Sequence, residues 1–279
     1  DHRDLHSFPT RRSSDLPINR LFKAEPTSGI MVGRDRLLMD VDPAVVEENL
    51  RWFYNRDFEK LEQYKINVSD TKSWSREKVY ARTNFEKSVK CLQKIQYRGF
   101  DYRHLAYDRD VVEGHRMGYI DQITPTNPAI TVTKASRKGS FCTAFISSKP
   151  IEKCYMSVTD TAYAFPLTFS GVSNLQLPSL LYKIDPESLF YYSYAVLWAP
   201  TYRQRYDEFL RKSYPGIPFP KNKQLYDDLA LLGKKLASAH LLEMSISPQL
   251  EPSDIQADDW IIGDIDRKST RLNSSHRIR

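Results

Sequence analysis

The segment Phe190–Pro220 restricts the fold of this chain more than any other part of the sequence. Pro200 lies in its middle, and proline neither donates a helical hydrogen bond nor lets the residue before it stay helical. The segment therefore predicts two short helices separated at Pro200, with Thr201 capping the second. A helical spacing predicts that the second helix buries one apolar face, formed by Tyr202, Tyr206, Phe209 and Leu210.

The sequence on either side of this segment changes character twice. Residues 43–64 and 75–95 have apolar residues at helical spacing, including Leu92 and Ile95, and therefore predict helices. Residues 97–107 and 129–169 contain short β-branched and aromatic runs between turn residues, which predicts strands. Residues 224–243 predict a last helix with one buried face, formed by Leu225, Leu229, Leu232, Leu236 and Ala239. This order predicts an α+β fold with an antiparallel or mixed central β region.

The same patterns divide the chain into parts. Residues 17–95 are expected to form a helical lead-in, residues 96–184 a β-rich region, and residues 185–250 a helical scaffold. Residues 1–16 and 266–279 read as translated sequencing adapter, and such additions are set aside before the fold is considered. We therefore expect both ends to be artefacts that do not belong to the natural protein.

The charge of the chain depends on those ends. The formal net charge is +6. Residues 266–279 carry five Lys or Arg against one Asp, and the first fifteen residues are neutral, so the remainder carries only +2. A basic domain is the electrostatic requirement for binding nucleic acid. The overall charge therefore does not by itself predict a nucleic-acid partner.

Sequence patterns for catalysis and for cofactor binding are absent. There is no GxGxxG, GxxxxGKS, GxxxxGKT, HExxH or GxSxG pattern. The three cysteines are widely spaced, and His104, His115 and His240 lack the spacing of metal ligands. No apolar run approaches the roughly 18 residues that span a bilayer. We expect no catalytic residue, cofactor or metal in this chain, no membrane partner, and a cytoplasmic location.

Two local clusters of cations remain when the ends are set aside. Residues 134–140 place Lys134, Arg137 and Lys138 beside two serines, on a turn between two predicted strands. Such a turn suits contact with DNA phosphates, and arginine can read guanine in the major groove. An ordinary charged turn is the alternative interpretation. The second cluster is Arg98 and Arg103, which alternate with aromatic residues.

Several blocks of the sequence, in order, resemble one protein family. The blocks are Ser28-Gly29-Ile30 with Arg34-Asp35, residues 97–103 (YRGFDYR, where the family has YRPFDxR), residues 127–134, Phe165-Pro166-Leu167 (FPLT for FPLY), Phe190–Pro220 and residues 240–243 (HLLE). The long block departs from the family pattern at Trp198, Ala199 and Gly216. On these blocks the chain resembles the C-terminal target-recognition region of type ISP restriction-modification enzymes and related adenine-N6 DNA methyltransferases.

The resemblance implies a truncated fragment of a larger prokaryotic enzyme, with double-stranded DNA and the upstream methyltransferase domain as partners. S-adenosylmethionine, and ATP with Mg²⁺ where the parent also cleaves DNA, would be bound upstream, with none in this fragment. Residues 96–184 would then read the DNA. Lys134, Arg137 and Lys138 become the first candidates for DNA contact, followed by Arg98, Arg103 and Arg203. For Arg203 a packing or ion-pair role is the favoured interpretation.

Two other functions stay open at this point. The chain is alternatively an interaction module that docks other domains of a multidomain enzyme without contacting DNA. A self-contained enzyme is the third interpretation, and the lack of any catalytic constellation counts against it.

Overall fold

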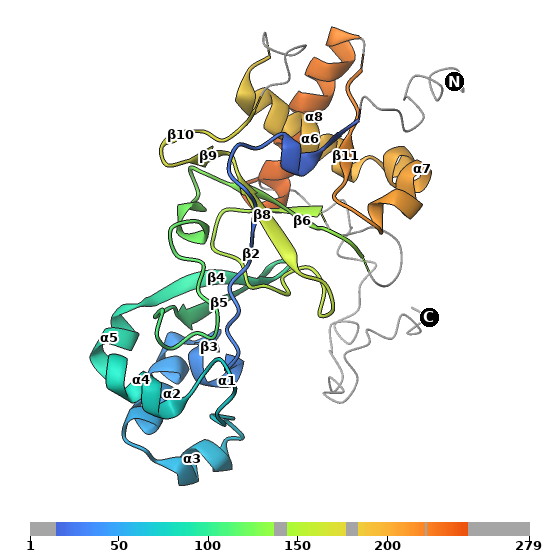
Figure 1. Ribbon diagram of the computed structural model, residues 1–279. Helices are drawn as coiled ribbons and strands as arrows, with labels where there is room; N and C mark the ends of the chain where they lie inside the picture. The colour runs from blue at the N-terminus through green and yellow to red at the C-terminus, as the bar shows by residue number, and fades with distance from the viewer. Residues whose placement is uncertain (1–14, 137–143, 177–183, 221, 245–279) are drawn as a thin grey trace, which may run out of the picture. The chain divides into compact units, whose positions relative to one another are not determined.

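The computed structural model describes residues 15–136, 144–176, 184–220 and 222–244 (Figure 1). Two of the candidate cations, Arg137 and Lys138, lie outside these residues, as does most of both predicted adapter segments. All described residues belong to one unit of the chain, which ends at Met244. Helices and antiparallel strands are both present, so the predicted α+β class is confirmed.

Five short helices lie between residues 35 and 90: α1 (Asp35–Leu38), α2 (Pro43–Tyr54), α3 (Phe58–Gln63), α4 (Arg76–Arg82) and α5 (Phe85–Lys90). The single helix predicted over residues 43–64 is wrong, because two helices form there. Arg56 lies between them with a left-handed φ of 59°, which a continuing helix does not allow. Asp57 then caps α3, accepting a hydrogen bond from the Lys60 amide at 3.2 Å.

The single helix predicted over residues 75–95 is also wrong, because α4 and α5 are separate helices and a strand replaces its C-terminal end. Strand β4 (Leu92–Arg98) begins there and pairs antiparallel with β5 (Asp101–Ala106), from Leu92 opposite Ala106 to Arg98 opposite Asp101. Leu92 and Ile95 therefore lie on a strand, and Ile95 is fully buried. Their spacing fits a helix as well as a strand. Pairing with β5, which lies later in the chain, decides between the two.

Two larger sheets form the β region, and all their pairings are antiparallel. The first has the order β3–β5–β4, where β3 is Met39–Asp40. The second has the order β2–β8–β6–β7, with β2 at Thr27–Ser28, β8 at Ala162–Pro166, β6 at Ala129–Thr133 and β7 at Ala144–Ser147. Two small pairs join β1 (Leu16–Pro17) to β11 (Gly216–Ile217) and β9 (Thr168–Phe169) to β10 (Val172–Ser173). Two 3₁₀ turns, η1 (Ile18–Arg20) and η2 (Ile120–Gln122), lie in the connections.

The helices after the sheets are α6 (Pro186–Trp198), α7 (Pro200–Leu210) and α8 (Lys223–His240). The predicted break at Pro200 is confirmed, but the cap at Thr201 is wrong. Ala199 is extended, with ψ of 121°, and Pro200 is the first helical residue, a position where its missing N–H costs nothing. Of the predicted apolar face, Tyr202, Tyr206 and Leu210 are buried, whereas Phe209 stays 38% exposed.

The face that α8 buries is the predicted one only in part, since Leu229 and Leu236 pack against the core. The helix buries Tyr226, Ala230, Gly233 and Ala237, whereas Leu232 is 56% exposed. Helix α8 packs against α6, which is apolar on most of its surface and carries bulky aromatic side chains. A second helix can approach such a helix closely only where its own side chains are small, because large side chains on both helices would keep their backbones apart. At Gly233 a Cβ atom would lie 2.0 Å from the Tyr191 carbonyl oxygen.

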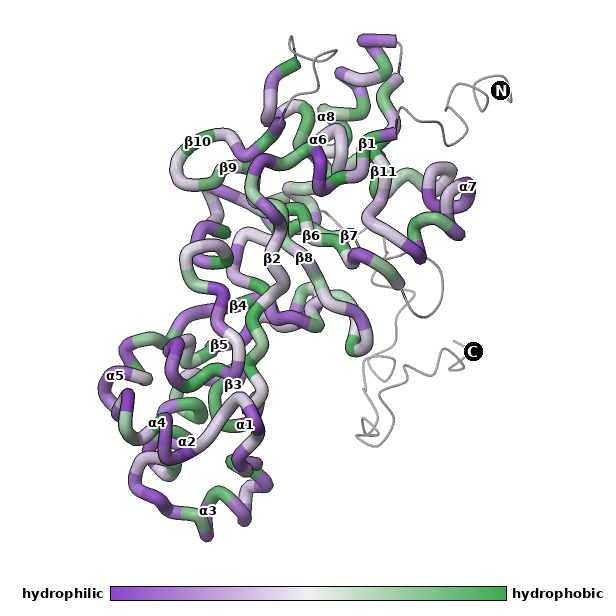
Figure 2. The backbone as a smooth tube through the Cα atoms, in the orientation of Figure 1, coloured by the Kyte–Doolittle hydropathy of each residue, from purple (hydrophilic) through white to green (hydrophobic). Residues whose placement is uncertain are grey.

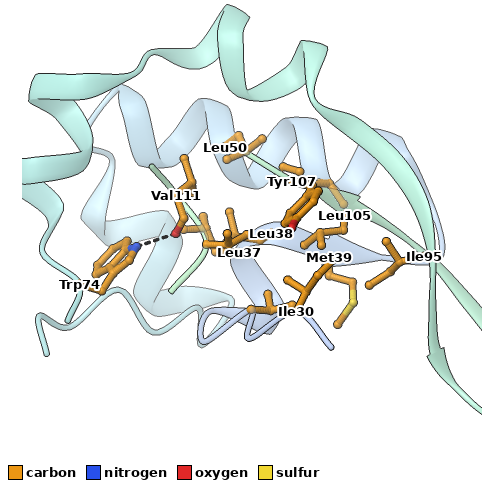
Figure 3. Close-up of a cluster of buried hydrophobic side chains, with 14 of the residues drawn as sticks. Ile30, Leu37, Leu38, Met39, Leu50, Trp74, Ile95, Leu105, Tyr107 and Val111 are labelled. Carbon is orange, nitrogen blue, oxygen red and sulfur yellow. Dashed lines mark hydrogen bonds between the residues drawn. The ribbon is translucent and has the colours of Figure 1, made fainter. Parts of the chain in front are cut away.

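Two hydrophobic cores share the larger sheet. The first packs the N-terminal helices around β3, β4 and β5, and Figure 3 shows part of it, including Trp74, whose Nε1 donates to the Val111 carbonyl at 2.7 Å. The second holds α6, α7 and α8. Alternate residues of β6 enter the two cores, since Ala129 faces the first and Ile130 and Val132 face the second. Burial on both sides explains why β6 is mostly apolar in Figure 2.

Candidate nucleic-acid interface

Lys134 is exposed at the end of β6, where the predicted basic turn begins. Its Nζ lies 5.9 Å from the centroid of the Tyr214 ring, within the range of a cation–π contact. Two residues later, the Ser136 amide donates to the Arg211 carbonyl at 3.1 Å. The start of the turn is therefore attached to the C-terminal end of α7, so Lys134 extends from a fixed part of the backbone.

A cavity of about 580 Å³ lies beside Lys134. Its wall combines two cations with aromatic side chains: Arg20, Lys134, Tyr202, Tyr206, Phe209 and Tyr214. Both phenols are uncharged at neutral pH, and burial raises the pKa of Tyr202 and of Tyr214 further above the ordinary value. Asp15 adds a carboxylate to the wall, but it belongs to the segment 1–16 that we expect to be foreign. Cations beside aromatic rings suit a ligand that carries both phosphates and bases.

Arg98 and Arg103 lie together on the β4–β5 hairpin, stacked on one aromatic ring. Their Cζ atoms are 3.8 Å and 4.2 Å from the Tyr97 ring centroid. Arg98 donates to Glu152 at 2.6 Å, and Arg103 donates to both oxygens of Asp101 through contacts of 2.9–3.2 Å. Each charge is therefore matched within the protein, and the side chains keep 29% and 31% of their surface exposed. Their contact with DNA stays a prediction.

Glu152, the partner of Arg98, is only 7% exposed. Burial raises the pKa of this carboxyl group, while the charge of Arg98 and hydrogen bonds from Arg98 and the Cys154 amide oppose the rise. The ion pair also joins two segments, because isolated bridges pair Ile151 with Gln96 of β4 and Glu152 with Ile30. Arg98 therefore holds the β4–β5 hairpin to this segment.

Arg203 occupies a third place, on α7. Its Nε donates to the Leu197 carbonyl at 2.7 Å, and its Cζ lies 4.2 Å from the Trp198 ring centroid. These contacts describe the packing role that the sequence left open, and contact with DNA stays a prediction here too. The Trp198 ring is 4.5 Å from His240, whose pKa is lowered by burial and by the charge of Arg203.

The structure thus separates the described candidates into three places: Lys134 beside the cavity, Arg98 with Arg103 on Tyr97, and Arg203 on Trp198. Sequence reasoning missed Arg20 and Tyr214, which only the tertiary structure brings to Lys134. It also missed the β9–β10 hairpin, for which the Ser170-Gly171 pair was a usable turn signal.

Neither a metal centre nor a membrane span is found in the part of the chain that the structure describes. Among residues 15–136, 144–176, 184–220 and 222–244, no group of three or more His, Cys, Asp and Glu side chains is placed to hold a metal ion. No helix within these residues is long and apolar enough to cross a bilayer.

Comparison with known proteins gives one family and several related structures. A family model described as the Type ISP C-terminal specificity domain matches residues 21–274. Three solved structures resemble the chain: a DrdV–DNA complex (TM-score 0.64, 20% identity), a nuclease-deletion mutant of the Type ISP restriction-modification enzyme LlaGI in complex with a DNA substrate mimic (0.62, 24%), and the ATP-dependent Type ISP restriction-modification enzyme LlaBIII bound to DNA (0.62, 21%). At these identities the likeness establishes the fold.

The match covers most of this chain and a minor part of each solved structure. The shares of this chain are 89%, 84% and 88%, and the shares of the three larger chains are 27%, 20% and 17%. A search of curated proteins finds no match.

Proposed function

Because the chain belongs to the Type ISP C-terminal specificity domain family, as its sequence blocks predicted, we propose that it is the DNA target-recognition region of a larger restriction-modification polypeptide. The observation that carries this proposal is the family match over residues 21–274. The three similar structures support it, since each contains DNA or a DNA mimic and each chain is several times longer than the matched part.

The geometry around Lys134 suits this function. Phosphate contacts fix the register of a protein on a duplex, and they need cations held on a rigid backbone. Lys134 meets this requirement because the end of α7 holds its turn, and Arg20 adds a second cation in the same cavity. We assign phosphate contact to Lys134 first, with Arg137 and Lys138 following along the same turn. Arg98, Arg103 and Arg203 are assigned as further candidates.

The chemistry is assigned to the parent polypeptide. A methyltransferase that modifies a base in a duplex must extrude that base from the stack, so a separate region has to grip the flanking DNA. In this proposal a methyltransferase domain upstream binds S-adenosylmethionine, and ATP with Mg²⁺ serves further upstream parts where the parent also cleaves DNA. The parent acts in the cytoplasm, where its DNA substrate lies.

The proposal is tested by measuring duplex affinity across a series of salt concentrations. Replacing Lys134 by Ala removes one phosphate contact, and the slope of log affinity against log salt then falls by about one unit. Arg137→Ala and Lys138→Ala are expected to behave in the same way. Lys235→Ala is the matched control, because Lys235 is exposed on α8. The basic residues 266–279 stay constant in all variants, so only differences between variants are interpreted.

Unchanged affinity and slope in all three turn variants would show that the turn is not the DNA surface. A wild-type chain that binds no duplex at any salt concentration would contradict the proposed function itself. That result would favour the alternative function, a module that docks other domains. The exposed side chains of Leu231 and Leu232, each 56% accessible on the outer side of α8, are the observation that favours this alternative.

A further inference from the structure

The β9–β10 hairpin is a short ribbon with a defined turn. Phe169 pairs with Val172, so only Ser170 and Gly171 form the loop. Both loop residues have positive φ angles, 51° and 78°, which is the conformation of a type I′ turn. Such a turn matches the twist of the two strands, so the tip has one preferred shape. For a serine this conformation is uncommon, and it needs support from the surroundings.

Polar side chains from the preceding connection supply that support. Gln122 accepts a hydrogen bond from the Ser170 amide at 2.6 Å, directly at the tip. At the base of the hairpin, Asn127 accepts from the Thr168 amide at 2.8 Å and donates to the Thr168 carbonyl at 3.0 Å. Asn127 also donates to the Gln122 carbonyl at 2.7 Å, which joins the two supports. All four contacts address backbone atoms, so they fix the shape of the hairpin whatever side chains it carries.

Packing fixes the base of the ribbon further. The Phe169 ring lies 5.1 Å from the Tyr119 ring. Asn174, which is 1% exposed, donates to the Pro166 carbonyl at 2.9 Å and accepts from the Ala24 amide at 2.9 Å. The hairpin therefore extends from a rigid base, as binding elements require.

The tip itself is exposed and uncharged. Ser170 and Gly171 are exposed, and Val172 is 63% exposed. None of residues 168–173 carries a charge, so the hairpin does not contribute a phosphate-binding cation. A serine hydroxyl and a valine side chain are groups that read base edges instead. Ser can donate to or accept from any base, and an apolar side chain can contact the thymine methyl group.

We propose that the tip of the β9–β10 hairpin reads base pairs in the major groove, with Ser170 and Val172 as specificity-determining residues. This inference rests on the proposed function as a DNA-recognition region. A two-stranded ribbon fits the major groove, which is about 12 Å wide. Gln122 and Asn127 are positioning residues in this arrangement, because they act only through the hairpin backbone.

The place of the hairpin relative to Lys134 agrees with this assignment. Asn127 lies just before β6 and holds the hairpin, whereas Lys134 follows the same strand at its other end. The five residues of β6 span about 16 Å at roughly 3.3 Å per residue. That length equals about five base pairs at 3.4 Å each. The separation along the strand is thus within the length of a short recognition site.

The test separates base reading from phosphate contact in the complete 279-residue chain. Wild-type protein first selects its preferred sequence from a pool of randomised duplexes. Val172→Ala and Ser170→Gly are then compared with it, glycine being chosen at position 170 because it adopts positive φ without strain. Each variant is expected to lose about 5- to 150-fold of the preference at one or two adjacent base pairs, the effect of a single mismatched pair. The salt slope stays that of the wild type.

Val41→Ala is the matched control, since Val41 is 67% exposed and lies beside β3, away from the hairpin in sequence. It is expected to keep the full preference, and Lys134→Ala is expected to change the salt slope while keeping the preference. Wild-type selection that persists unchanged in both hairpin variants would overturn the inference and leave the proposed function standing. An equal loss in Val41→Ala would also overturn it. A wild-type chain that binds no duplex would overturn both.

Discussion

The contact between α6 and α8 leads to a prediction about Gly233, for which two physical effects have opposite signs. In a helix, alanine is more favourable than glycine by about 1 kcal/mol, because glycine loses more backbone freedom on folding. The intrinsic preference alone therefore predicts that Gly233→Ala stabilises the protein. The packing predicts the reverse, since the new Cβ would lie 2.0 Å from the Tyr191 carbonyl oxygen and 2.8 Å from its carbon.

The contact outweighs the preference because the obstructing atoms belong to the backbone. Cβ atoms essentially never lie within 3.0 Å of such an oxygen, so α8 has to move by about 1 Å relative to α6. Adding a methyl group to a filled core costs typically about 1–3 kcal/mol. We expect Gly233→Ala to lower the free energy of unfolding by about that amount. For a chain of this size, the melting temperature falls by about 2–4 °C for each kcal/mol.

The assay is urea unfolding of the full chain, followed by far-ultraviolet circular dichroism and by tryptophan fluorescence. Leu232→Ala is the matched control, because it changes the neighbouring residue on the same helix but removes a side chain that is 56% exposed. Exposed substitutions of this kind stay within about 0.5 kcal/mol. If Gly233→Ala unfolds at a urea concentration equal to or above that of the wild type, the close approach of the two helices is refuted.

Three further predictions concern contacts described above. Arg98→Ala leaves Glu152 buried without its cation and costs about 1–3 kcal/mol of unfolding free energy at pH 7. The folded-state pKa of Glu152 then lies still further above its unfolded value, so the loss shrinks as the pH falls towards 4 and the carboxyl group is protonated. Equal losses in urea unfolding at both pH values would contradict this. His240 has a folded-state pKa below its unfolded value near 6.5, so the free energy of unfolding falls as the pH drops through that range. His240→Gln should weaken this pH dependence. An unchanged plot of unfolding free energy against pH would exclude His240 as its source. Asn127→Ala removes three hydrogen bonds and should lower the free energy of unfolding in urea by about 1–3 kcal/mol. The Thr168 amide should also exchange faster with solvent. Unaltered exchange at Thr168 would contradict the role of Asn127 in holding the hairpin backbone.

Local patterns predicted the elements that are governed by local chemistry. The break at Pro200 follows from the geometry of proline, and the strands of the β region follow from runs of β-branched residues between turns. The helical spacing of Leu92 and Ile95 misled because pairing with β5 outweighs a local preference. The face of α8 was predicted only in part, because the leucine spacing locates Leu229 and Leu236 at the core but does not indicate the small residues at the centre of the contact. Small residues such as Gly233 form the contact, while the larger Leu232 is exposed.

The candidate site was predictable only in part, because several of its features depend on tertiary structure. Lys134 was found from a run of cations in the sequence. Arg20 and Tyr214 come to the same cavity from distant segments, and no sequence spacing indicates that meeting. The engagement of Arg98 by Glu152 is equally remote in sequence, since the two residues are separated by 54 positions. Conversely, the Ser170-Gly171 pair was a visible turn signal in the sequence, but only the structure shows that Gln122 and Asn127 hold this hairpin by hydrogen bonds.

The burial of β6 on both faces has a consequence for cooperativity. Opening either core exposes one side of the same strand, so neither half can unfold while the other keeps its full packing. The amides of β6 should therefore exchange with solvent only through global unfolding and be the most protected in the chain. Limited proteolysis should likewise fail to release one core as a stable fragment. The hairpin held at one end of this strand and Lys134 at the other end are thus both attached to a strand that is buried on two sides.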